Sequence, residues 1–208
     1  INPVDAAGLP VSRLVAINGQ VQSNILSVQG GAVWFSTPGG FLLGPTANFN
    51  VGSLLLTSGV VGTSGGLFGP GGEIRIAGTP ASGGVTVAGG ARINALYSLT
   101  ASNAYVAMVA PRVEQAGQIT VDGAVALVAA EVADITVNNG LFDIQVTVGT
   151  GDANGIVHTG STTGPSDFSA TRESRAYMVA IPKNTAIEML IGGTVGFATA
   201  LQATVAND

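Results

Sequence analysis

Short apolar runs alternate with turn-forming residues along the whole chain. Glycine pairs bound many of the runs, and strict apolar–polar alternation occurs at Glu73–Ile76 and Gln118–Val121. Short runs bounded by turn residues are typical of β-strands. Strands are therefore expected at Ala32–Phe35, Phe41–Leu43, Leu54–Thr57, Val85–Val87, Tyr105–Ala110, Val125–Ala129, Ile144–Val148, Tyr177–Ile181 and Ala186–Ile191.

Part of this pattern repeats along the chain. Tyr105–Ala110 returns as Ala124–Ala129, and Ala176–Pro182 is a looser copy of the same run. Gln118–Val121 returns as Asp134–Val137. A repeat of about 20 residues, made of short strands and turns, is typical of a solenoid. The sequence predicts an all-β, parallel β-helix of roughly ten coils, about 50 Å long at about 4.8 Å per coil.

Two stretches interrupt the regular pattern. Ser58–Gly72 is long and glycine-rich, and Thr150–Arg175 is polar. Both are expected to leave the coil as one or two extra-helical loops or hairpins, at about 58–72 and 150–175. Neither is interpreted as a domain linker, so residues 1–208 are expected to form a single β-helix domain.

Composition excludes several classes of protein. Glycine supplies 31 of the 208 residues, and its recurring pairs disfavour helices. Only 9% of the residues are charged, and seven scattered Lys and Arg cannot neutralise a nucleic-acid backbone. There is no cysteine, which excludes disulfides and thiolate metal sites. Mean hydropathy is +0.48, but no apolar run approaches the roughly 20 residues of a membrane span.

No cluster of residues indicates catalysis, a metal or a cofactor. His158 is the only histidine, no Gly-x-Ser-x-Gly motif accompanies it, and it is interpreted as a solvated loop residue. Asp122, Glu131 and Asp134 are the closest group of acids and are interpreted as charges that keep the molecule soluble. A polysaccharide-cleaving β-helical enzyme, which would use these acids, stays an alternative. We expect a protein that is not an enzyme.

The polar stretch holds the residues best suited to contact a partner. A loop that projects from a rigid scaffold is where binding residues concentrate. The candidate contact loop for a host or cell-surface ligand comprises His158, Asp167, Arg172, Glu173 and Arg175.

One stretch resembles a known family. It runs Val33-Trp34-Phe35-Ser36-Thr37-Pro38-Gly39-Gly40-Phe41-Leu42-Leu43-Gly44-Pro45 and continues to Thr57. It resembles the secretion domain of two-partner-secretion exoproteins, the filamentous-haemagglutinin type, in which an apolar strand precedes Asn-Pro-Asn-Gly-Ile, an aromatic or aliphatic pair and Gly. Thr37-Pro38-Gly39-Gly40 stands here in place of Asn-Pro-Asn-Gly. The resemblance extends from Val15 to Val137, with Gly117–Ala130 similar to a later pair of the family's coils.

The resemblance implies a right-handed β-helix that an outer-membrane barrel transporter exports from a Gram-negative bacterium. It implies a secreted or cell-surface adhesin, of which this chain is a fragment or processed part. Its motif makes one set of residues candidates for transporter recognition and for nucleation of the fold: Trp34, Phe35, Thr37, Pro38, Gly39, Gly40, Phe41 and Gly44.

The alternative function is structural. A low-charge β-helix with an uncapped end presents unpaired strand edges, which favours end-to-end self-association. Under this hypothesis the chain is a self-assembling subunit of an extracellular filament or surface layer.

Overall fold

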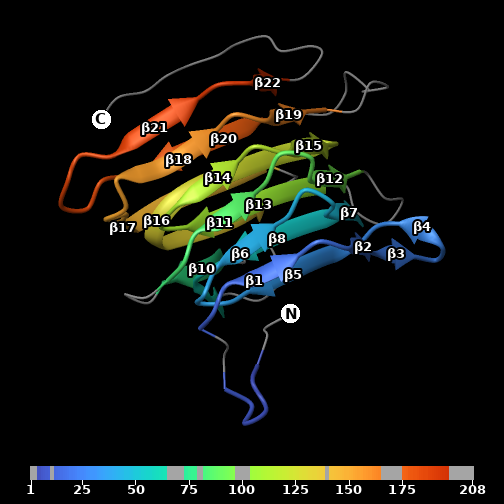
Figure 1. Ribbon diagram of the computed structural model, residues 1–208, viewed down its shortest axis with the longest axis horizontal. Coiled ribbons are helices and arrows are strands. Elements are labelled where there is room, and N and C mark those ends of the chain that lie inside the picture. The colour runs from blue at the N-terminus through green and yellow to red at the C-terminus, as the bar shows by residue number, and fades with distance from the viewer. Residues whose placement is uncertain are drawn as a thin grey trace.

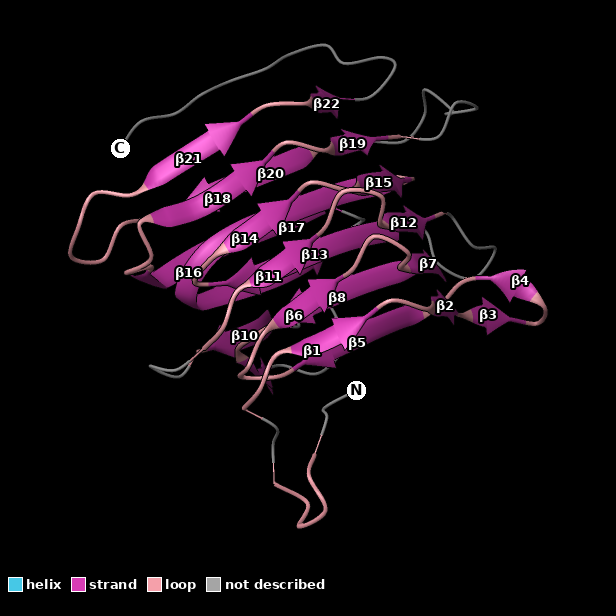
Figure 2. Ribbon diagram, viewed as in Figure 1, coloured by secondary structure: helices cyan, strands magenta, loops and turns pink. Residues whose placement is uncertain are grey.

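The computed structural model describes residues 4–9, 12–64, 73–78, 82–96, 104–138, 141–164 and 175–196, and these contain strands and turns but no helix (Figure 2). The chain passes through three sheets in turn and then starts again one level further along (Figure 1). We call each such pass a circuit.

Three stacks of parallel strands result. Sheet 1 contains β1 (Val15–Ile17), β6 (Phe41–Leu43), β11 (Val85–Val87), β14 (Val113–Gln115), β18 (Asn154–His158) and β21 (Glu188–Ile191). Sheet 2 contains β2 (Gln20–Gln22), β7 (Asn48–Val51), β12 (Arg92–Ala95), β15 (Gln118–Val121), β19 (Ser161–Thr163) and β22 (Thr194–Gly196). Sheet 3 contains β5 (Ala32–Ser36), β8 (Ser53–Thr57), β13 (Ala104–Ala110), the first part of β16 (Gly123–Asn138) and β20 (Ala176–Ala180).

Neighbouring strands within each stack are parallel and in register, an arrangement consistent with a β-solenoid. The prediction of an all-β chain is confirmed. The repeat of the Tyr105 run at Ala124 is also confirmed as a structural register, because Tyr105 pairs with Ala124 and Ala110 with Ala129. The looser copy at 176–180 lies in the same sheet, but Tyr177 stacks two positions away from Tyr105, in the column of Ala107 and Ala126.

The circuits are longer and fewer than the sequence predicts, because most of them carry insertions. The described residues make six circuits instead of ten. Successive circuits return to one position of sheet 1 at Val15, Phe41, Val85, Val113, Ile156 and Met189. The second repeat expected from the sequence is not structural, because Gln118–Val121 lies in sheet 2 while the segment at 134–137 pairs with other strands.

The three sheets enclose an interior core of stacked apolar side chains. One column of sheet 1 runs through Phe41, Val85, Val113 and Ile156, all fully buried. Stacked circuits satisfy the backbone hydrogen bonds between levels, so apolar side chains can fill the inside with little need for charge.

A second, antiparallel sheet lies outside sheet 3. It contains β9 (Val60–Ser64), β10 (Glu73–Ala77), the second part of β16 and β17 (Leu141–Gly149). Its inner face packs on the outer face of sheet 3 and forms an outer core that includes Leu55, Tyr105, Ile76, Ile135 and Phe142. β16 therefore belongs to two sheets, and a register shift near Val132 marks the change.

The two insertions lie partly where the sequence places them. The first, expected at 58–72, contributes the hairpin of β9 and β10. The polar stretch expected to leave the coil at 150–175 instead supplies β18 and β19 of sheets 1 and 2, and the second hairpin comes earlier, from β16 and β17. The prediction from polarity was wrong because the polar side chains of His158 and Thr162 point inward and form a hydrogen bond with each other. Residues 165–174 lie outside the described residues.

No helix in the described ranges is long and apolar enough to cross a membrane.

Candidate functional site

The turn between β5 and β6 is a tightly closed corner from sheet 3 to sheet 1. Thr37 is fully buried, and its amide donates to the Thr57 carbonyl at 3.1 Å. The Gly40 amide donates back to the Thr37 carbonyl at 3.0 Å and closes the turn. Gly40 has φ +82°, a conformation that residues with a Cβ rarely adopt. The glycine at this position is therefore required by the backbone.

Neighbouring circuits stack on this corner without room for side chains. A Cβ at Gly40 would collide with the Gly84 carbonyl oxygen of the next circuit, and one at Gly39 would collide with the backbone of Arg13. The Pro38 carbonyl accepts a hydrogen bond from the Gly83 amide at 2.7 Å. The motif is thus built for close backbone contact between three successive levels.

Three phenylalanines meet inside the first two circuits. Phe35 lies 6.0 Å from Phe41 and 6.1 Å from Phe49 between ring centroids, with interplanar angles of 70° and 74°. These edge-to-face contacts are the favourable arrangement for aromatic pairs. Each ring comes from a different sheet, so the cluster joins all three sheets at the start of the stack. The sequence analysis identified Phe35 and Phe41 but missed Phe49, because its membership depends on how the corner folds.

Trp34 points the other way, into the outer core. Its indole Nε1–H donates to the Tyr105 hydroxyl at 2.8 Å, across 71 positions of sequence. Tyr105 in turn packs edge-to-face on Phe142, with ring centroids 5.8 Å apart. Burial raises the pKa of Tyr105 to about 12, and the hydrogen bond from Trp34 opposes part of that rise. No pattern in the sequence indicates this pairing.

The candidate residues are not exposed in the folded chain. Phe35, Thr37, Gly40, Phe41 and Gly44 are buried. Trp34, Pro38 and Gly39 are half-buried. The arrangement can stabilise the start of the stack, and recognition of these side chains by a transporter would have to precede folding.

His158 is fully buried in β18 and does not belong to an exposed loop. Its Nδ1 lies 2.8 Å from the Gly192 carbonyl oxygen, and its Nε2 lies 2.9 Å from the Thr162 hydroxyl. Because a carbonyl can only accept, Nδ1 carries a proton, and in the neutral ring Nε2 accepts from the Thr162 hydroxyl. Gln115 stacks beside His158 in sheet 1 and donates to the Ser161 carbonyl at 3.1 Å. This polar cluster ties together the fourth, fifth and sixth circuits.

The rest of the expected contact loop is only partly visible. Asp167, Arg172 and Glu173 lie outside the described residues. Arg175 is exposed, and its carbonyl accepts the Val125 amide at 2.8 Å. Of the candidate contact residues, the structure describes only His158, which is buried, and Arg175, which is exposed.

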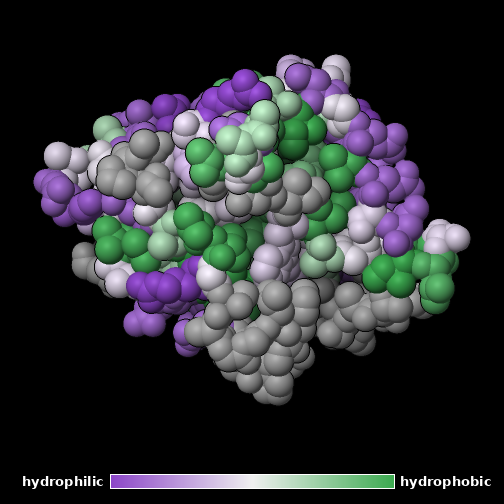
Figure 3. Space-filling view, turned by 90° about the horizontal axis from the view of Figure 1, so that it is seen from below, coloured by the Kyte–Doolittle hydropathy of each residue, from purple (hydrophilic) through white to green (hydrophobic). Residues whose placement is uncertain are grey.

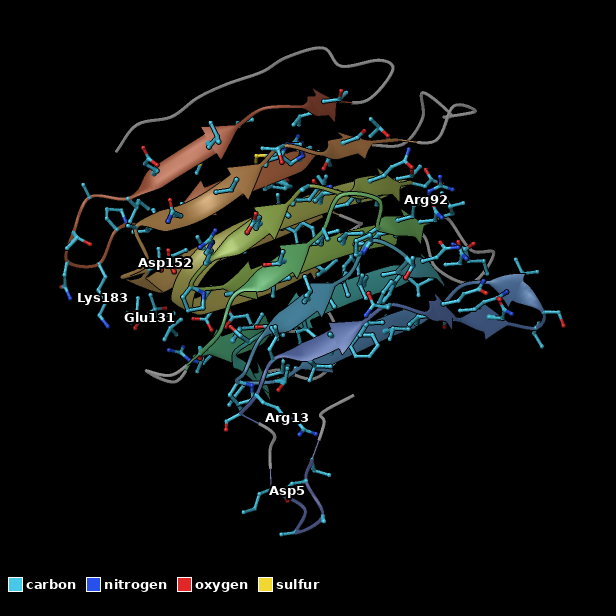
Figure 4. The ribbon with its side chains drawn as sticks, viewed as in Figure 1. Asp5, Arg13, Arg92, Glu131, Asp152 and Lys183 are labelled. Carbon is cyan, nitrogen blue, oxygen red and sulfur yellow. The ribbon has the colours of Figure 1, made fainter. Side chains whose placement is uncertain are left out.

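Of the three acids considered for catalysis, two are held in ion pairs and the third is buried. Glu131 pairs with Lys183 at 2.7 Å (Figure 4), Asp134 pairs with Arg75 at 3.0 Å, and Asp122 is buried at the turn before β16. No three His, Asp or Glu side chains within the described ranges form a group that could hold a metal ion.

No protein-family model matches the sequence. No curated protein matches it either.

Proposed function

We propose that this chain is a right-handed parallel β-helical segment of a secreted or cell-surface protein of the two-partner-secretion adhesin type. It is not an enzyme. An outer-membrane barrel transporter exports it, and it folds outside circuit by circuit.

The observation that carries the proposal is the strand order. In each of the three parallel stacks the strands follow one another in chain order, from β1 to β21, from β2 to β22 and from β5 to β20. A chain that emerges from a pore with its N-terminal side first can therefore add each circuit to a finished one. No later strand of these stacks has to be inserted between earlier ones.

The start of the chain also suits this route. No ionisable residue occurs between Arg13 and Glu73, so the parallel strands of the first two circuits fold without desolvating a charge. The Phe35, Phe41 and Phe49 cluster lies in these circuits and buries a large aromatic area early. Burial of this cluster outside the membrane would favour outward movement of the following chain.

The chemistry of the remaining side chains supports a role without catalysis. Glu131 and Asp134 are each engaged in an ion pair, and both ring nitrogens of His158 have partners inside the stack.

The proposal is tested in the source cells. An antibody raised against the purified chain should label intact cells or detect the chain in the medium, on a polypeptide well above 20.5 kDa. Replacing Phe35 and Phe41 by Asp should abolish this signal because the first circuits cannot form. Ile156→Asp, which buries one Asp in the column of Phe41 three circuits later, should leave most of the signal. Antigen found only inside lysed cells would refute export.

The second candidate function is self-assembly. The last described circuit exposes Met189, Leu190, Ile191 and Val195, which form an apolar group in β21 and β22, the outermost described strands of sheets 1 and 2. Such a surface supports end-to-end association. Rods that lengthen with protein concentration in electron micrographs would favour this function, and a monomer at every concentration would contradict it.

A further inference from the structure

A small hairpin projects from the first circuit between sheets 2 and 3. It contains β3 (Asn24–Ile25) and β4 (Val28–Gln29), which pair antiparallel through a two-residue turn (Figure 1). Ile25, Leu26 and Val28 are all exposed, and Leu26 at the apex is 90% exposed. The tip is therefore an aliphatic surface that is partly open at Ile25 and Val28 and almost fully open at Leu26.

The turn is strained. Leu26 and Ser27 have φ values of +49° and +66°, and no other described non-glycine residue has a positive φ. This turn geometry is the one that Asn-Gly adopts readily and that Leu adopts at a cost. Because Leu26 contacts almost nothing, folding alone does not account for a leucine here. Strained positions that persist in a fold are often functional.

The base of the hairpin is firmly held. The Gln29 side-chain amide donates to the Val51 carbonyl at 2.9 Å and to the Asn94 carbonyl at 3.0 Å, reaching two further circuits. The Ser23 amide donates to Asn50, and the Gly30 amide donates to Ser23, both at 2.9 Å. The apolar tip is thus presented in a fixed position.

Nothing charged surrounds the tip in the sequence. The hairpin lies within the stretch between Arg13 and Glu73 that has no ionisable residue. Asp5 and Arg13 lie below β1, away from the hairpin (Figure 4). In the view from below, the hairpin forms a hydrophobic projection at the edge of the molecule (Figure 3).

We propose that the Ile25–Val28 tip inserts into an electrically neutral lipid surface. Leucine, isoleucine and valine are favourable in the hydrocarbon region, whereas the anchors of protein interfaces are mostly Trp, Tyr and Arg. A projecting tip reaches a flat bilayer first, and the stretch from Leu14 to Gly72 that contains it has no charge to desolvate as the tip enters. Binding is weak and reversible, since only three aliphatic side chains take part. This inference does not depend on the export route.

Lipid binding can be tested by labelling a single introduced cysteine, because the chain has no cysteine of its own. Ser27→Cys gives a single labelling site for an environment-sensitive fluorophore. With phosphatidylcholine vesicles, its emission should shift to the blue, and the unlabelled wild-type chain should float with the vesicles. Raising the salt concentration should change the partition coefficient less than about two-fold, because no charge contributes at the tip.

A paired variant separates lipid binding from folding. Leu26→Asn with Ser27→Gly suits the turn, so it should fold with equal or higher thermal stability and yet lower the partition coefficient about ten-fold or more. Val60→Thr, at another exposed valine, should bind like wild type.

Two results would overturn the proposal. One is the absence of any binding to neutral vesicles, which would redirect attention to a protein pocket as the partner. The other is binding that the paired variant retains, or that requires anionic lipid and disappears in salt. Neither result bears on whether the chain is exported.

Discussion

At the scale of single residues, the corner at Thr37–Gly40 depends on two glycines that have no Cβ. Gly40 combines a positive φ with a backbone oxygen of the next circuit in the place of its missing Cβ. The resemblance pointed to this turn from the sequence. The reason that glycine is needed appears only when Gly84 is stacked on it.

Gly40→Ala should lower the free energy of unfolding by about 2–4 kcal/mol, because it adds a left-handed alanine and a backbone collision. Denaturant midpoints measure the loss. Gly19→Ala is the matched control, since a Cβ at Gly19 would have no atom within 4 Å and the φ of Gly19 is not positive. It should change stability by less than about 0.5 kcal/mol. Equal effects at the two glycines would contradict the stacked corner.

Tyr105 should make the chain less stable in strong alkali. Its pKa is about 12 in the folded chain and 10.0 when solvated, so the unfolded state loses the proton first. The stabilising contribution is fully present below pH 10 and is lost as pH rises toward 12. The loss is on the order of 2 kcal/mol.

Tyr105→Phe removes this titration and leaves the other two tyrosines unchanged. Its stability should therefore fall less steeply between pH 10 and 12 than that of wild type. Parallel curves for the two proteins would show that Tyr105 is not the titrating group.

At the scale of elements, strand positions were largely predictable and their partners were not. Each expected apolar run overlaps a strand, and the Tyr105 and Ala124 runs stack as their similarity indicates. The outer sheet was missed because the sequence from Ala124 to Val137 reads as two repeats, whereas β16 continues straight from one sheet into another. Whether this segment forms two strands or one continuous strand depends on pairing with β10, which lies far earlier in the chain.

The outer core should loosen locally when one of its aromatic side chains is removed. Phe142→Ala removes an aromatic contact with Tyr105 and should cost about 3 kcal/mol. Trp34 is the only tryptophan and packs in the outer core, so its emission should shift to the red. Asp143→Ala, the next residue on the exposed face, is the control and should leave the emission unchanged. A red shift in both variants would exclude a specific role for Phe142.

At the scale of the molecule, the strands of each parallel circuit are hydrogen-bonded to those of the circuit before it. The candidate site illustrates how far the sequence can reach. The sequence identified the corner and two of the three phenylalanines. The sequence wrongly indicated an exposed loop position for His158, which faces inward, because a single histidine gives no periodic pattern.

Ile156→Asp in the purified chain should leave the earlier circuits folded, so limited proteolysis should yield a protected fragment that ends before β18. Phe41→Asp buries the same charge at the other end of the same column and should leave no protected fragment. Similar digestion of the two variants would contradict stepwise dependence of later circuits on earlier ones.

β16 has a consequence for how the whole molecule melts. Stacked repeats commonly lose structure from their ends in several steps. Here one continuous strand of 16 residues is a member of both a parallel and an antiparallel sheet, and it lines both cores. Because β16 lines both cores, neither core can unfold completely on heating while β16 stays folded in the other. In differential scanning calorimetry the region around β16 should unfold in a single heat-absorption peak. The van't Hoff enthalpy of that peak should equal its calorimetric enthalpy.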